Sequence, residues 1–137
     1  TVEAPFGHSH WRLSSRPLLA IAGGLGIAPL KSILEAHLAE SSLTPATLYW
    51  GVRNAHHLYL DTHFRDMAQK YPGFSYIPVL SETSDDSYRT GFPGPAVLED
   101  IPTLEAYDIY MAGPPAMIDA TRPLLLQAEA DPAHMFS

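Results

Sequence analysis

A short apolar run that passes directly into closely spaced glycines constrains this chain more than any other feature. Residues 18–22 (LLAIA) are continuously apolar, which is typical of a strand covered on both faces of a sheet. Three glycines follow within four positions, and a helical apolar stripe begins at Leu30, directly after Pro29. This order predicts a strand, a tight turn and a helix, which are the opening elements of a βαβ unit.

Strand and helix patterns alternate along the rest of the chain. The further strand patterns fall at residues 47–50, 74–80 and 108–111. Apolar residues follow helical spacing at residues 30–38, 60–71 and 117–128, and a short helix is expected at 96–100. We therefore predict an α/β fold, namely a doubly wound, open parallel sheet of about five strands, Rossmann-like, with helices on both faces.

Prolines and one polar stretch modify this expectation. Pro78 has no N–H for the ladder, which favours an edge position for the strand at 74–80. Pro123 falls inside the last helix and predicts a kink or break there. Residues 81–95 are polar and rich in glycine and proline, so they are expected to form a loop.

Composition argues against several classes of function. The 137 residues fit one domain, and 46% hydrophobic residues are typical of a folded chain. Fifteen acidic residues against eight basic ones give a net charge of −7, which argues against nucleic acid or a membrane as a partner. The sequence has no cysteine, so these residues offer no thiolate ligand for an iron–sulfur cluster. No apolar run approaches the roughly 20 residues of a membrane helix, and we expect a cytoplasmic location.

The glycine-rich turn at residues 22–29 is the first candidate binding element. It lies at the carboxyl end of an expected parallel strand, where open sheets bind ligands. Glycine lets the backbone approach a ligand closely, and the helix start that follows favours an anion such as a phosphate. A tight turn without a ligand is the alternative interpretation. The spacing is not Gly-x-Gly-x-x-Gly, since no further glycine follows before Gly51, and it is not a P-loop, since Leu30 precedes Lys31.

A second turn of the same kind opens the last helix. Gly113, Pro114 and Pro115 follow the strand pattern at 108–111, and Met117 begins the helical stripe. Two glycine-bearing strand ends of one parallel sheet can form two walls of a single crevice. Their coincidence is more specific for a ligand site than either turn alone.

Other patterns do not indicate catalysis or metal binding. The chain has seven histidines, but no two are spaced as ligands on one helix face. It lacks the Gly-x-Ser-x-Gly turn of serine hydrolases, and the paired carboxylates Asp85 and Asp86 fall in the expected loop. We therefore expect no catalytic residue and no metal ligand in this chain.

Four segments resemble the nicotinamide-nucleotide-binding domain of the ferredoxin–NADP reductase family. They are residues 22–29 (AGGLGIAP), 48–53 (LYWGVR), 78–81 (PVLS) and 110–117 (YMAGPPAM). The likeness is greatest to reductase components of bacterial aromatic-ring dioxygenases, of the naphthalene dioxygenase reductase type.

The resemblance implies a division of labour between domains. An upstream domain holds FAD, and this domain binds NADH or NADPH and presents the nicotinamide to the flavin for hydride transfer. Electrons then pass to an iron–sulfur centre on another domain or partner, such as a ferredoxin or an oxygenase. Residues 2–7 resemble the end of the flavin domain, with Ala4 in place of a family glycine. We expect residues 1–15 to be the remnant of that domain and a connector, and residues 16–137 to form the NAD(P)-binding domain.

The resemblance also implies which residues contact the coenzyme. They are Gly23, Gly24, Leu25, Gly26 and Pro29, then Gly51, Val52 and Arg53, then Ser81 and Glu82, and finally Gly113, Pro114, Pro115 and Met117. The first group would lie beneath the pyrophosphate and nicotinamide, the middle groups beside the adenosine ribose, and the last group over the nicotinamide side. Two departures from the family are Leu25, where a hydroxyl is common, and Ala112, where many members have cysteine. We expect both to lower the efficiency of hydride transfer without preventing binding.

Charge near the ribose decides between NADH and NADPH. A 2′-phosphate requires cations, and Arg53 and Arg89 are the candidates. Glu82 opposes that phosphate and can instead accept hydrogen bonds from ribose hydroxyls, so we favour NADH with some tolerance of NADPH. His56 and His57 are expected near the adenosine pocket, where they would reach a phosphate when protonated.

A sensor or regulatory domain that binds a dinucleotide without redox chemistry is the alternative function. The turn at residues 23–29 suits both functions. The turn at 113–117 and the segment at 2–7 favour the reductase.

Overall fold

Six parallel strands form one sheet in the order β4-β3-β2-β1-β5-β6 in the computed structural model, which describes residues 16–40, 44–83 and 87–137. The strands are β1 (Leu18–Gly23), β2 (Ala46–Val52), β3 (Phe74–Leu80), β4 (Arg89–Thr90), β5 (Asp108–Ala112) and β6 (Met135–Phe136). The α-helices are α1 (Ile27–Glu40), α2 (Asp61–Lys70), α3 (Pro93–Asp100) and α4 (Pro115–Gln127). Three short 3₁₀ helices are η1 (Gly24–Gly26), η2 (Ala55–His57) and η3 (Pro132–His134).

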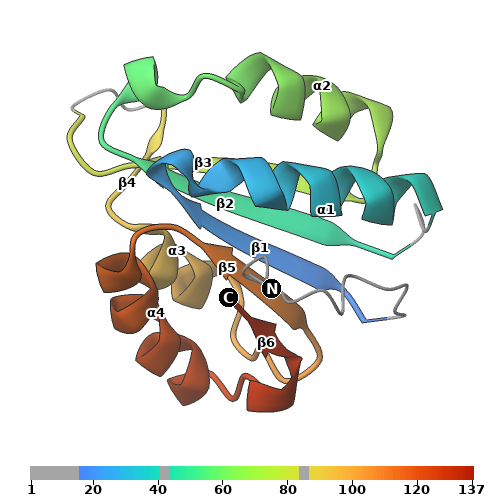
Figure 1. The fold of residues 1–137 in the computed structure, drawn as a ribbon, viewed down its shortest axis with the longest axis vertical. Coiled ribbons are helices and arrows are strands. Elements are labelled where there is room, and N and C mark those ends of the chain that lie inside the picture. Colours follow the sequence, from blue (N-terminus) through green and yellow to red (C-terminus); the bar gives the residue numbers. More distant parts are fainter. Residues whose placement is uncertain (1–15, 41–43, 84–86) are drawn as a thin grey trace, which may run out of the picture.

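The sheet separates two apolar cores, one on each face. Helices α1 and α2 cover one face, and α3 and α4 cover the other (Figure 1). Alternate residues of β1 point into the two cores: Leu18 and Ala20 pack with α1, while Leu19 and Ile21 pack with α3 and α4. This arrangement confirms the predicted doubly wound α/β fold.

The sheet has six strands where about five were expected, and the two outermost strands are only two residues long. β4 pairs with Val79 and Leu80 of β3, and β6 pairs with Ile109 and Tyr110 of β5. Pro78 therefore lies where β3 has no outer strand partner among the described residues. The edge position expected from Pro78 holds for most of β3, although β4 extends the sheet beyond it.

The last helix runs from Pro115 through Pro123 to Gln127 without interruption, so a break at Pro123 is wrong. Pro123 and Asp119, whose carbonyl loses its helical donor, are both exposed, and water can therefore hydrate that carbonyl. Helix α3 begins at Pro93, earlier than expected, because proline suits the first turn of a helix.

Two further sequence predictions can be compared with the described residues only in part. The expected loop at residues 81–95 contains β4 and the first turn of α3, so it is only partly irregular. The predicted flavin-domain remnant at residues 1–15 lies outside the described residues, as do Asp85 and Asp86. Within the part of the chain that is described, no helix is both long and apolar enough to span a membrane.

Candidate functional site

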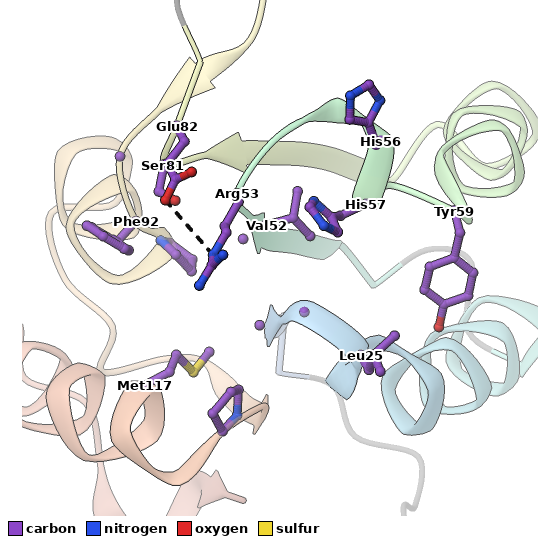
Figure 2. Close-up of a pocket in the computed structure, with 16 residues that line it drawn as sticks. Leu25, Val52, Arg53, His56, His57, Tyr59, Ser81, Glu82, Phe92 and Met117 are labelled. Atoms are coloured by element: carbon purple, nitrogen blue, oxygen red, sulfur yellow. Dashed lines mark ion pairs between the residues drawn. The ribbon is translucent and has the colours of Figure 1, made fainter.

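A cavity of about 700 Å³ opens at the carboxyl ends of the central strands (Figure 2). Its lining residues are Gly23, Gly24, Leu25, Gly51, Val52, Arg53, His56, His57, Tyr59, Ser81, Glu82, Gly91, Phe92, Pro93, Pro114 and Met117. These residues are far apart in the sequence, but each group follows a strand of the same parallel sheet, so they meet at one edge. Most of the residues expected from the sequence to bind a coenzyme therefore line one cavity.

The turn from β1 into α1 forms the first wall. Gly24 has φ of +56°, a left-handed backbone conformation that favours glycine. The buried indole of Trp50 donates a hydrogen bond of 2.9 Å to the Gly24 carbonyl and fixes the turn. Leu25 is 82% exposed at this wall, so the cavity has an apolar rim there.

Gly26 and Gly113 allow the two glycine turns to pack closely against each other. A Cβ on Gly26 would lie 2.5 Å from the carbonyl oxygen of Ala112, and a Cβ on Gly113 would lie 3.2 Å from the nitrogen of Gly23. These glycines permit close backbone packing beneath the cavity. The expected coenzyme-binding residues that do not line the cavity are Gly26, Pro29, Gly113 and Pro115.

The second wall joins β2 to α3. A Cβ on Gly51 would lie 2.6 Å from Cδ of Pro93, so the start of α3 rests directly on the end of β2. Gly91 has φ of +109°, and Phe92 is 65% exposed beside it. Residues 91–93 fall in the segment predicted to be a loop, so their place in the site does not follow from the sequence. The order Gly-Phe-Pro-Gly at residues 91–94 was the available signal, since it resembles the other glycine- and proline-bearing turns.

Tyr59 is a further lining residue that is not among those predicted from the sequence. Its ring makes an edge-to-face contact with Trp50, with 5.6 Å between the ring centroids. His56 and His57 lie in η2 and line the cavity, which agrees with their expected place near the pocket. The side chain of Asn54 caps η2 by accepting a 3.1 Å hydrogen bond from the His56 amide.

Charged side chains gather at one end of the cavity. Arg53 Nε lies 3.9 Å from a carboxylate oxygen of Glu82, and the two side chains are 75% and 65% exposed (Figure 2). Such an exposed pair is weak, so both groups are available to a ligand. Arg89 does not line the cavity, because its guanidinium is bound to Glu99 and Asp100. The prediction that Arg89 reaches a 2′-phosphate is therefore wrong.

The lining suits a large ligand that is partly apolar and partly anionic. Leu25, Phe92, Pro114 and Met117 provide apolar contacts, while Arg53 provides a cation. Over the described ranges, no three His, Asp or Glu side chains are grouped as a metal site. The arrangement can bind and orient a ligand.

Comparisons with known proteins agree with this geometry. The family model for the oxidoreductase NAD-binding domain matches residues 20–123. The reductase subunit of an aromatic O-demethylase from Amycolatopsis is 42% identical over 104 residues, which cover 76% of this chain and 31% of that protein. A probable flavin reductase from Photobacterium leiognathi is 36% identical over 140 residues, which cover 100% of this chain and 60% of that protein. The chain thus spans only part of the curated relatives that it matches.

Solved structures give the same result. The Amycolatopsis cytochrome P450 reductase GcoB has a TM-score of 0.89 at 35% identity, covering 96% of this chain and 41% of that one. The ferredoxin reductase in carbazole 1,9a-dioxygenase has a TM-score of 0.76 at 27% identity, covering 90% of this chain and 37% of that one. The predicted resemblance is confirmed, and the chain belongs to the oxidoreductase NAD-binding domain family, in the ferredoxin reductase group.

Proposed function

We propose that this domain binds NADH in the cavity and holds the nicotinamide ring for hydride transfer to FAD on an upstream domain of the same polypeptide. The observation that carries the proposal is the meeting of two strand ends in one cavity: the glycine turn at residues 23–25, and Pro114 and Met117 of the turn that follows β5. The relatives named above support it, because they are described as reductases and a flavin reductase.

The cavity suits a dinucleotide in size and chemistry. Its volume of about 700 Å³ lies within the roughly 300–1,000 Å³ that is usual for cofactor sites. Apart from Gly24 and its two chain neighbours, nothing lies within 4 Å of the position where a Cβ on Gly24 would stand, so a ligand can approach the backbone there. Arg53 would lie beside the adenosine ribose, and His56 and His57 would reach a phosphate of the coenzyme.

The residues of the chain act by positioning. When bound, the reduced coenzyme supplies the hydride that reduces the flavin. Met117 and Pro114 would provide the apolar contact for the nicotinamide side, and Leu25 would exclude water from it. Met117 packs closely against Gly23, because a Cβ added to Gly23 would lie 3.3 Å from the Cε of Met117. This contact holds the Met117 side chain in place. The chain needs no acid or base for this role, because a hydride passes directly between two rings.

The test follows flavin reduction in the intact protein after anaerobic mixing with NADH. Met117→Ala is expected to slow flavin reduction about tenfold, because a poorly held ring loses its reactive orientation. Met135→Ala, a half-buried methionine of β6 outside the cavity, is the matched control and should leave the rate unchanged. The proposal fails if NADH neither binds nor reduces the flavin, or if the two variants behave alike.

The preference for NADH rests on Glu82. Its exposed carboxylate lies at the same end of the cavity as Ser81 and Arg53, where it would accept hydrogen bonds from ribose hydroxyls and repel a 2′-phosphate. Glu82→Arg is expected to shift the ratio of kcat/KM values toward NADPH by about tenfold or more. Glu105→Arg makes the same change of charge before β5, away from the cavity, and should leave the ratio unaltered. An unchanged ratio in Glu82→Arg would contradict this assignment.

The remaining parts of the proposal concern the whole protein. We propose that residues 1–15 connect to the FAD-binding domain, that residues 16–137 form the NAD(P)-binding domain, and that a ferredoxin or oxygenase with an iron–sulfur centre accepts the electrons in the cytoplasm. Restoring the upstream domain and measuring reduction of such an acceptor tests this order of transfer. The sensor alternative gains no support from the comparisons.

A further inference from the structure

A single guanidinium joins the strand that precedes the wall segment, which we define as residues 91–93, to the helix that begins at its last residue. Arg89 lies in β4 just before this segment, and Asp100 is the last residue of α3, which begins at Pro93. Arg89 Nη1 donates to Asp100 Oδ2 at 3.0 Å, and Nη2 donates to Oδ1 at 3.1 Å. Nη2 also donates to the Glu99 carboxylate at 2.8 Å and to the Ala96 carbonyl at 3.2 Å. The bidentate geometry of the pair between Arg89 and Asp100 fixes both the orientation and the distance of α3 relative to β4.

The same carboxylate is anchored to the centre of the sheet. The hydroxyl of Tyr49, a residue of β2 that is 1% exposed, donates a 2.7 Å hydrogen bond to Asp100 Oδ2. Burial, together with the hydrogen bond to Asp100, raises the pKa of the Tyr49 hydroxyl, which therefore remains a donor. The hydrogen bonds from Arg89 lower the pKa of Asp100, which therefore remains an ionised acceptor.

The wall segment itself is held on both sides of Phe92. The Gly91 amide donates a 2.9 Å hydrogen bond to the Leu80 carbonyl, and Pro93 rests on Gly51. Phe92 is largely exposed, and it lies in the same part of the cavity as Glu82 (Figure 2). The orientation of Phe92 therefore depends on the fixed positions of its two neighbours.

We infer that Arg89 and Asp100 are positioning residues that set the affinity of the cavity for the adenosine half of the dinucleotide. This inference rests on the proposed function. The flat ring of Phe92 offers a face on which adenine can stack, and Glu82 offers acceptors for ribose hydroxyls. A wall segment that is already ordered loses less conformational entropy when the ligand binds. The ion pair of Arg89 with Asp100, which we call the clamp, therefore contributes to affinity without touching the ligand.

The experiment uses the intact, flavin-loaded protein and three ligands. Arg89→Met keeps an unbranched apolar stem and removes the guanidinium with its charge and its hydrogen bonds. We expect the KM for NADH to rise about tenfold and kcat at saturating NADH to stay unchanged, because the nicotinamide end is not altered. The inhibition constant of ADP-ribose should rise by a similar factor. Reduced nicotinamide mononucleotide, which lacks the adenosine half, should keep its kcat/KM.

Control variants distinguish a positioning role of Arg89 from a general destabilisation of the fold. Arg65→Met removes the 2.7 Å ion pair with Asp61 on α2 and should change none of the three readouts. Arg89→Lys should restore part of the lost affinity. If Arg89→Met does not fold, Asp100→Asn serves instead, since it weakens the clamp and keeps an acceptor for Tyr49.

Two results would overturn the inference. One is an unchanged KM for NADH in the folded clamp variant, and the other is an equal loss with NADH and with the mononucleotide. Failure of the unaltered protein to bind NADH would instead overturn the proposed function, so the two failures are distinguishable.

Discussion

Replacing Gly26 with alanine tests the packing of the two glycine turns most sharply. The added Cβ would lie 2.5 Å from the Ala112 oxygen, 2.6 Å from the Ala112 carbonyl carbon and 2.7 Å from the Gly113 nitrogen. All three are backbone atoms at the end of β5, so no side-chain rotation relieves the contact. Ordinary van der Waals separation requires the turn and the strand end to part by about 1 Å, which a close-packed interior resists.

The expected cost lies at the upper end of the range for over-packing, about 3 kcal/mol of unfolding free energy. For a chain of this size, that corresponds to a fall in melting temperature of roughly 10 °C. Gly24→Ala in the same turn is the matched comparison, because it meets no atom within 4 Å but has φ of +56°. Its cost should be about 1 kcal/mol, set by backbone conformation alone.

Urea-induced unfolding followed by tryptophan fluorescence measures both free energies. The packing account predicts that Gly26→Ala is the more destabilised variant by about 2 kcal/mol. Equal destabilisation of Gly24→Ala and Gly26→Ala, or a larger loss in Gly24→Ala, would refute it.

Three other substitutions have defined outcomes. Gly51→Ala places a Cβ 2.6 Å from Pro93, so it should cost about 1–3 kcal/mol in urea unfolding and raise the dissociation constant for NADH measured by titration calorimetry. Trp50→Phe removes the 2.9 Å hydrogen bond to the glycine turn and should cost about 1–3 kcal/mol, and a stability equal to that of the unaltered protein would count against this contact. Asp100→Asn should be less stable than the unaltered protein at neutral pH. Because hydrogen bonds from Arg89 lower the pKa of folded Asp100 from 3.8, this difference should be complete above about pH 5 and shrink as the pH falls through the folded pKa. A difference that stays constant down to pH 2 in acid unfolding would contradict that assignment.

The fold was predictable because its central strands are apolar on both faces and end in glycine. Residues 18–22 and 109–112 are continuously apolar and each run leads directly into a glycine, a pattern visible without tertiary structure. β4 and β6 were not predictable as strands, since each pairs only two residues and depends on a neighbour already in the sheet. Of the kink or break expected at Pro123, the break is wrong, because proline propensity says nothing about which side of a helix faces water.

The candidate site was predictable where glycines mark strand ends. It was much less predictable where tertiary packing decides whether a residue lines the cavity. Gly24 and Gly26 have equal standing in the sequence, yet one lines the cavity and the other admits the β5 backbone. Both uses require the absence of a Cβ, so the residue type cannot distinguish them. Arg89 was misassigned for a related reason, because its partners Glu99 and Asp100 come together with it only through the packing of α3.

The most direct test of the central claim is a titration of the isotope-labelled protein with NADH, followed by backbone amide chemical shifts. The account predicts saturable shifts concentrated at residues 23–25, 51–53, 81–82, 91–92 and 117, around the cavity. Amides near Arg16 and His134, which lie outside the cavity lining, should change little. Saturating NADH that leaves the cavity amides unmoved, or that shifts chiefly the amides near Arg16 and His134, would contradict the account.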